Sequence, residues 1–241
     1  MQPVRSANDW WREAAAEDGL KWLDFRVAKD DDLATLSKNA VLEFERGKQL
    51  TGMPTGPELS LLEVGCGGGR MTWVLADAFG QVVAADISDA YIKLAEQYCK
   101  KPNVIFRTIS GNDLDALRDR VYDVVFSYEV FHHLERHVLE RYVSDIHGLL
   151  RQGGTFVLEL NTTPMRLLTR ISIIFRYALH LAGKRHWRGW PTSPYFARIP
   201  YSAETIHGIL TRAGFQVQKV LQPGKPQTWF VATTSAPSPP S

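Results

Sequence analysis

Only two cysteines, Cys66 and Cys99, occur among the 241 residues, so the chain lacks the material for a disulfide framework or a cysteine-rich metal centre. It also lacks an uninterrupted apolar run of about 18 residues, so no transmembrane helix is expected. Residues 1–6 lack the apolar core of a signal peptide. The formal net charge of +2 is close to zero and identifies no partner. These absences predict a protein of a reducing cytoplasm, long enough for one α/β domain with an insertion.

The most informative stretch runs from Leu61 to Arg70, LLEVGCGGGR, in which an apolar segment passes into a glycine cluster. The next residues, 71–76, are typical of a helix. A buried strand that enters a glycine turn and then opens a helix is a nucleotide-binding arrangement. Glycines let the backbone approach a ligand and adopt positive φ, and the start of a helix offers free N–H donors.

Two classes of ligand, dinucleotides and S-adenosylmethionine (SAM), are bound by turns of this general kind. A dinucleotide site requires the pattern G-x-G-x-x-G, but Arg70 occupies the position of the third glycine. Glu63 precedes the first glycine by two residues, and a carboxylate there would repel a pyrophosphate. SAM carries an amino group and a sulfonium and has no phosphate. The pattern Glu63-x-Gly65-x-Gly67-x-Gly69 resembles the first motif of class I SAM-dependent methyltransferases.

This resemblance covers about residues 59–160 and implies an α/β fold, a Rossmann-like, mostly parallel sheet of seven strands with helices on both faces. The second strand, 82–85, ends at Asp86, where a carboxylate can bind both ribose hydroxyls of SAM. Asp86 as a mere helix cap is the alternative. After the third strand, 104–108, the family position that meets adenine falls at Asn112–Leu114, although Asp113 could instead cap a short helix.

A second resemblance to these enzymes lies in the strand 122–127 and the segment YEVFHHL that follows it. Ligands of parallel sheets bind at the carboxyl ends of the strands, so this segment is expected at the site. A hydroxyl acceptor benefits from a general base, and His132 and His133 are the candidates, with His132 favoured. Helix packing is the alternative role for either histidine, and no metal site is predicted. The residues expected to bind the cofactor are Glu63, Gly65, Cys66, Gly67, Gly69, Asp86, Ile87, Asn112, Asp113, Leu114, Ser127 and Glu129.

The chain is expected to divide into five parts. A helical extension with Trp10, Trp11, Trp22 and Phe25 precedes the core and contains a helix start at residues 30–32. The C-terminal part holds a helix from about Tyr201 to Gly214 and the last two strands, 216–220 and 228–233. The expected parts are an N-terminal extension or cap (1–58), a SAM-binding core (59–162), a basic amphipathic insertion (163–200), a C-terminal helix and strands (201–234) and a disordered tail (235–241).

The insertion has no acidic residue between Leu160 and Ala203 and contains seven basic ones. On a helix over 166–182, the apolar residues share one arc of about 160°, with only Ile173 misplaced. Three interpretations are open. The helix packs its apolar arc on the domain, or it is a lid over an anionic acceptor or one with an anionic head, or it lies on a membrane surface through residues 166–190.

The function expected from this resemblance is transfer of a methyl group from SAM, with S-adenosylhomocysteine (SAH) as the product. A small-molecule or lipid-linked acceptor is expected, methylated at oxygen, with nitrogen and carbon left open. A SAM- or nucleoside-binding regulatory or scaffold protein without turnover is the alternative, and Glu63 and Arg70 argue against a NAD-dependent oxidoreductase. Nucleic acid is not expected, because no wide basic surface exists beyond the insertion. The expected location is the cytoplasm, with membrane association as a variant.

Overall fold

The computed structural model describes residues 7–18, 33–188 and 190–235. The aromatic residues Trp22 and Phe25, the expected helix start at 30–32 and the expected tail from residue 236 onward lie outside these ranges.

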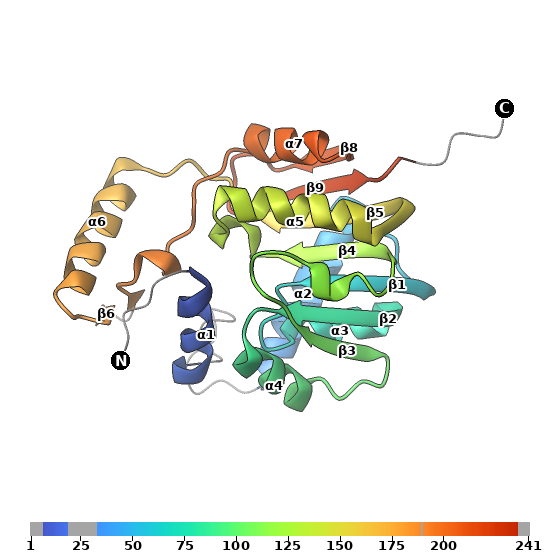
Figure 1. Ribbon diagram of the computed structural model, residues 1–241, viewed down its shortest axis with the longest axis horizontal. Coiled ribbons are helices and arrows are strands. Elements are labelled where there is room, and N and C mark those ends of the chain that lie inside the picture. Colours follow the sequence, from blue (N-terminus) through green and yellow to red (C-terminus); the bar gives the residue numbers. More distant parts are fainter. Residues whose placement is uncertain (1–6, 19–32, 189, 236–241) are drawn as a thin grey trace.

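A central sheet has the strand order β3-β2-β1-β4-β5-β9-β8 (Figure 1). The first five strands of this order pair in parallel, and β9 pairs antiparallel with both β5 and β8. The predicted fold class, a mostly parallel sheet of seven strands, is thereby confirmed. The strands are β1 (Gly56–Val64), β2 (Phe79–Asp86), β3 (Val104–Thr108), β4 (Tyr122–Tyr128), β5 (Leu150–Leu160), β8 (Gln216–Leu221) and β9 (Thr228–Thr233).

Helices cover both faces of the sheet, because successive apolar side chains of β1 point to opposite faces and both faces must be buried. Leu61 is buried in the cluster that includes α2 and α3, whereas Leu62 and Val64 are buried in the cluster that includes α5 and α7. Ile92 of α4 packs with Ala84 of β2. The helices around the sheet are α2 (Leu33–Thr51), α3 (Arg70–Ala78), α4 (Asp89–Tyr98), α5 (Arg136–Leu149) and α7 (Ala203–Arg212), with the short turns η1 (Asp115–Leu117) and η2 (Phe131–His133).

Two helices lie beyond the carboxyl ends of the parallel strands, α1 (Ala7–Asp18) and α6 (Leu167–Leu181) (Figure 1). Trp10 of α1 packs against Phe196, with ring centroids 5.4 Å apart. The chain from α6 back to the core passes through a two-strand hairpin and a single helical turn. These are β6 (His186–Trp187), β7 (Trp190–Pro191) and η3 (Pro194–Phe196).

Helix α6 carries no buried residue, and its apolar arc faces outward. The interpretation in which this arc packs on the domain is therefore wrong. The opposite arc, which contains Ile173, is the one that turns toward the protein. None of the helices in the described ranges has the length and apolar character needed to cross a bilayer. The large apolar side chains exposed on α6 are Leu167 (72%), Leu168 (79%), Ile171 (53%), Ile174 (68%), Phe175 (49%) and Leu181 (70%).

Candidate functional site

The glycine turn after β1 is held in a conformation that only glycine accepts without strain. Gly65, Gly67 and Gly69 have φ values of 84°, 52° and 84°. The N–H of Gly65 donates to the carbonyl of Ala85 at 2.7 Å, which ties the turn to β2. A Cβ atom at Gly65 would lie 2.3 Å from Cγ2 of Val130. The turn is thus pressed between β2 and the segment after β4.

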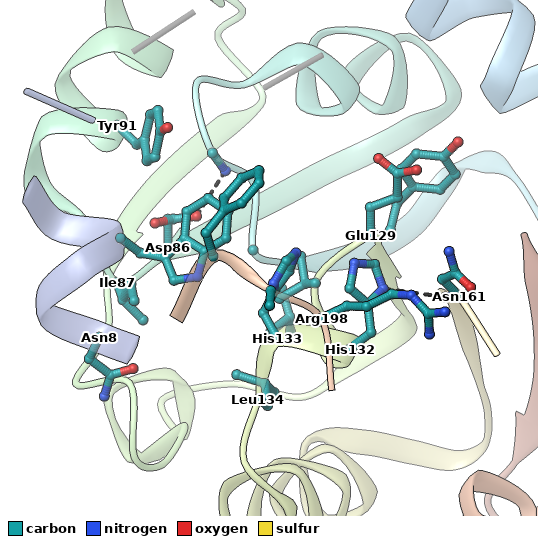
Figure 2. A pocket seen from close by; sticks show the side chains of 18 of the residues that line it. Asn8, Asp86, Ile87, Tyr91, Glu129, His132, His133, Leu134, Asn161 and Arg198 are labelled. Carbon is teal, nitrogen blue, oxygen red and sulfur yellow. Dashed lines mark hydrogen bonds between the residues drawn. The ribbon is translucent and has the colours of Figure 1, made fainter. Parts of the chain in front are cut away.

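A cavity of about 820 Å³ opens above this turn, at the carboxyl ends of the parallel strands (Figure 2). Its wall combines the ends of β1, β2 and β4 with η2, α1, α6 and η3. The structure brings nine of the predicted site residues to this wall. They are Glu63, Gly65, Cys66, Gly67, Asp86, Ile87, Glu129, His132 and His133.

Five other predicted site residues do not line the cavity. Gly69 caps α3, and Ser127 donates its hydroxyl to the carbonyl of Val64 at 2.8 Å. The backbone N–H groups of Asn112 and Asp113 donate to the hydroxyl oxygen of Ser110. Leu114 is fully buried in the core. Ile109, three residues before Asn112, is the residue of this loop that reaches the wall.

Glu63 is buried at the end of β1 and accepts a hydrogen bond from the Thr72 hydroxyl at 2.6 Å. Burial raises the pKa of Glu63 to about 7, and the Thr72 hydrogen bond and the nearby Arg70 lower it only in part. A cationic group bound beside Glu63 would favour its ionised form. The site is therefore suited to an ammonium ligand.

Asp86 lies at the end of β2 and supports the glycine turn. One carboxylate oxygen accepts the Gly67 N–H at 2.9 Å, and the other accepts the Ser88 N–H at 2.9 Å. Each oxygen keeps a second lone pair, so the carboxylate can still accept hydrogen bonds from two hydroxyls. Burial raises the pKa of Asp86, and the backbone N–H donors oppose that shift. Capping the turn and binding a ribose are compatible roles for this side chain.

Two tyrosine hydroxyls near Asp86 lack partners. The hydroxyl oxygens of Tyr91 and Tyr142 are buried, and neither makes a hydrogen bond with the residues that the structure describes. Both side chains line the cavity, and the charge of Asp86 contributes to raising the pKa of each. Buried polar groups without partners mark places where a polar ligand is missing. With Glu63 and Asp86, they fit the amino and ribose groups of SAM.

The two histidines of η2 differ in their hydrogen bonds (Figure 2). Nδ1 of His132 accepts the Asn161 backbone N–H at 3.3 Å, which places its proton on Nε2 and occupies its lone pair. Nδ1 of His133 is buried and has no hydrogen-bond partner among the described residues. Burial lowers the pKa of His133 to about 4, so its ring is neutral near pH 7. Burial, with the charges of His133 and Arg198, also lowers the pKa of His132.

Glu129 enters the cavity through a strained backbone. Its φ of 58° is unusual for a residue other than glycine. The Glu129 N–H donates at 2.9 Å to Oε2 of Glu159, a fully buried side chain on β5. Burial raises the pKa of Glu159 well above its usual value, with the charge of Glu129 adding to the shift. This buried carboxyl group anchors the turn that follows β4.

Sequence reasoning did not assign several residues of the wall. Trp11 of α1 packs edge-on against His133, with ring centroids 4.9 Å apart. Arg12 does not line the cavity, but it donates to the carbonyls of Ile87 and Ser110, each at 3.0 Å, and so fixes α1 over the loops after β2 and β3. The tryptophan content of the N-terminal extension was the only signal for this contact. The other unassigned wall residues include Asn8, Tyr91, Ile109, Tyr128, Tyr142, Arg176, Phe196 and Arg198.

Comparisons with known proteins agree with this geometry. Residues 62–158 match the family model described as a methyltransferase domain. The chain is 35% identical over 165 residues to a ubiquinone biosynthesis O-methyltransferase of Rickettsia akari, covering 68% of this chain and 61% of that protein. It is 27% identical over 226 residues to the human mitochondrial ubiquinone biosynthesis O-methyltransferase, covering 89% of this chain and 55% of that protein. The chain spans about half the length of the curated relatives it matches.

Among solved structures, the fold is similar to that of magnesium protoporphyrin IX methyltransferase from Synechocystis PCC 6803 with bound SAM. The TM-score is 0.62 at 15% identity, with 98% of this chain and 100% of that chain covered. At this identity the likeness shows the fold alone. The fold and the acid-led glycine turn define the class I SAM-binding architecture. The family match covers residues 62–158, so this part of the chain is similar to the SAM-dependent methyltransferases.

Proposed function

We propose that this chain transfers a methyl group from SAM to an oxygen atom of a small-molecule or lipid-linked acceptor. The observation that carries the proposal is the single cavity described above. It places the Glu63 and Asp86 carboxylates beside the glycine turn and a neutral histidine within the same space. The names of the similar O-methyltransferases support oxygen as the target.

Each part of the cavity has a role in this reaction. When bound, SAM supplies an electrophilic methyl group on a sulfonium. Glu63 holds the amino group, and Asp86 accepts hydrogen bonds from the ribose hydroxyls. Both acids thereby act on the ends of the cofactor rather than on the reacting sulfur, whose positive charge disappears as the methyl leaves. The apolar walls from Trp11, Trp187 and Phe196 exclude water from the acceptor.

An acceptor hydroxyl must lose its proton as oxygen attacks the methyl group. His133 is the better candidate to accept that proton, since Asn161 already occupies the lone pair of His132. A neutral ring is available at pH 7 because the pKa of His133 is about 4. His132, held by the Asn161 N–H and packed 4.4 Å from His133, positions its neighbour.

Calorimetric titration with SAM, SAH and NAD tests the cofactor, and SAH release tests the reaction. We expect binding of SAM and SAH without binding of NAD. In the second assay, catechol-type and other phenolic acceptors are compared with matched anilines, and we expect SAH release with the phenols. Preference for the anilines would reject oxygen as the target. Binding of SAM without turnover of any acceptor would favour the regulatory alternative.

We also propose that α6 contacts an anionic membrane surface. Its outward arc exposes the six large apolar side chains named above, and the inward arc of the same helix lines the cavity through Thr169, Ser172, Ile173 and Arg176. Exposed arginine and lysine side chains flank the apolar arc, where they would meet lipid phosphates. A lipid-linked acceptor could then reach the cavity along one helix. The flanking exposed side chains are Arg166, Arg170, Lys184, Arg185 and Arg188.

Sedimentation with lipid vesicles tests this contact. We expect binding to vesicles that contain phosphatidylglycerol, weaker binding to pure phosphatidylcholine, and loss of binding at high salt. Replacing Leu168, Ile171 and Ile174 with serine should remove vesicle binding. The matched control replaces Leu42 and Val121, two large apolar side chains that are each 63% exposed elsewhere on the protein. Equal losses in both variants, or no vesicle binding by the unmodified protein, would contradict the proposal.

A further inference from the structure

Two arginines project into the half of the cavity that lies away from the glycine turn. Arg176 comes from the inward arc of α6, and Arg198 comes from the segment just after η3. Figure 2 shows Arg198 beside His132 and Asn161. Both residues therefore line the space that the proposed function assigns to the acceptor.

Each guanidinium group is anchored at one nitrogen and has another nitrogen to spare. Nη2 of Arg198 donates to the Thr163 carbonyl at 2.7 Å, while Nη1 is buried without a partner among the described residues. Nη2 of Arg176 donates to the Pro191 carbonyl, while Nε is likewise buried without a partner. The Arg176 guanidinium carbon lies 5.6 Å from the centre of the Phe196 ring, which helps to orient it.

Among the residues that the structure describes, no acidic side chain forms an ion pair with Arg176 or Arg198. The sequence has no acidic residue between Glu159 and Glu204, a stretch that contains both arginines. Burial lowers the pKa of Arg176 and of Arg198, and no acidic side chain contributes to either shift. A half-buried guanidinium group with a buried, unpartnered nitrogen is stabilised when a ligand supplies an acceptor and a negative charge.

We propose that Arg176 and Arg198 form an oxyanion-binding subsite, which recognises a carboxylate or phosphate group on the acceptor. The inference rests on the proposed function, because it assigns the substrate class of that same cavity. Guanidinium groups bind these anions through charge-assisted hydrogen bonds from fixed N–H directions. An acceptor held there by its anionic group would present its hydroxyl toward the adjacent histidines.

The subsite also gives a reason for arginine rather than lysine on α6 and in the segment just after η3. A lysine amine that donates to the Thr163 or Pro191 carbonyl has no second, rigidly oriented nitrogen for a ligand. A guanidinium group can hold a carbonyl at one nitrogen and offer another to an anion. The two anchoring carbonyls thus fix the direction of the free N–H groups before any acceptor arrives.

The first experiment compares 3,4-dihydroxybenzoate with its methyl ester as acceptor, with SAH release as the readout. We expect a lower KM for the acid, and we expect Arg198→Met and Arg176→Met each to raise that KM about 10- to 100-fold while changing the ester little. Arg198→Lys should restore only part of the difference. The matched control is Arg107→Met, because Arg107 is an exposed arginine that does not line the cavity.

A second measurement separates this proposal from the proposed function. Protection against thermal unfolding by benzoate and by phenyl phosphate reports anion binding without turnover, and SAM titration of each variant reports the cofactor site. Protection by either anion that disappears in the methionine variants, with SAM affinity retained, supports the subsite and identifies the anion. Equal KM values for the acid and the ester in all variants, or no protection by either anion, would overturn it even if phenols are methylated.

Discussion

The two halves of the cavity are built in opposite ways. The cofactor half consists of strand ends and a glycine turn whose side chains are buried in the core and whose carboxylates Glu63 and Asp86 are fixed by hydrogen bonds. The half that we propose for the acceptor is formed by α1, α6 and η3, with α6 burying none of its residues. One half is acidic and part of the sheet, and the other is basic and lies beyond the carboxyl ends of the strands.

This contrast separates two requirements of a transferase. The cofactor is the same in every reaction of the class, so a site within the packed sheet is sufficient to bind it. The acceptor differs from one enzyme to another, and its site is carried by peripheral segments that can change without disturbing the core. Substitutions in the first half should therefore change cofactor affinity, and those in the second should change the acceptor or the membrane contact.

The largest effect is expected where the two halves meet. Replacing His133 with glutamine should lower kcat about 10²- to 10⁴-fold with a phenolic acceptor, because proton acceptance is lost while the polar volume is kept. Replacing His132 with glutamine should lower kcat much less. Steady-state SAH release measures both variants, and equal losses would contradict the assignment of the proton acceptor to His133.

Replacing Gly65 with alanine should weaken SAM binding about 100-fold. The residue has a φ of 84°, and a Cβ atom there would collide with Val130, so the turn must move. The control is Gly153→Ala, which has a φ of 73° but no atom within 4 Å of the added Cβ. Calorimetry compares their SAM affinities, and unchanged affinity in Gly65→Ala would show that the turn does not hold the cofactor.

Replacing Glu63 with glutamine should weaken SAM binding about tenfold. It should also abolish the release of a proton that accompanies SAM binding at pH 6. Because the pKa of Glu63 is about 7, the free protein carries this proton at pH 6, and an ammonium group bound beside it should release the proton. Titrations at pH 6 in buffers of different ionisation enthalpy count the protons released. We expect release from the unmodified protein and none from the variant, and equal counts would contradict the role of Glu63.

The raised pKa of Glu63 also has a consequence for stability: the glutamine variant that weakens SAM binding should stabilise the free protein at high pH. The folded state favours protonated Glu63, so this stabilising contribution is complete below pH 4.5 and is lost as pH rises through 7. At pH 8 the buried charge costs about 3 kcal/mol relative to an exposed carboxylate, from the shift of its pKa. Glu63→Gln should therefore stabilise the free protein at pH 8 and have little effect at pH 4.5. Thermal unfolding at the two pH values measures this difference.

The smallest effect is expected on the outer face of α6. Replacing Leu168 and Ile174 with serine should change the free energy of unfolding by less than about 0.5 kcal/mol per site, because both side chains are exposed. Replacing the fully buried Leu158 with alanine should cost about 2–5 kcal/mol. Chemical denaturation compares the variants. A loss of several kcal/mol in the α6 variant would mean that this face is packed against something in solution.

Sequence patterns predicted the core well and the periphery poorly, for a physical reason. The predicted strand 104–108 has the observed bounds, and residues 71–76, which are typical of a helix, lie within α3, since hydrophobic periodicity and the glycine turn are local signals. β1 begins at Gly56, before the apolar stretch that starts at Leu61, because strand pairing extends beyond the apolar residues.

The site shows the same division. The spacing of Glu63, Gly65 and Asp86 follows from one strand–turn–helix unit and the next strand, so these residues were found together. Arg198 and Trp11 reach the cavity only through the packing of η3 and α1, which no local pattern encodes. The outward direction of the α6 apolar arc was also beyond sequence analysis, because periodicity shows that an arc exists and not which way it faces.

Arg12 connects α1 to the loops that follow β2 and β3. Arg12 grips the backbone of the loop at Ile87 and the loop at Ser110 with two hydrogen bonds from a single guanidinium group. Any tilt of α1 must break both bonds at once and must also shift Trp11 away from His133. Arg12→Ala should therefore loosen α1 from both loops and from His133 together, because one guanidinium group makes both hydrogen bonds.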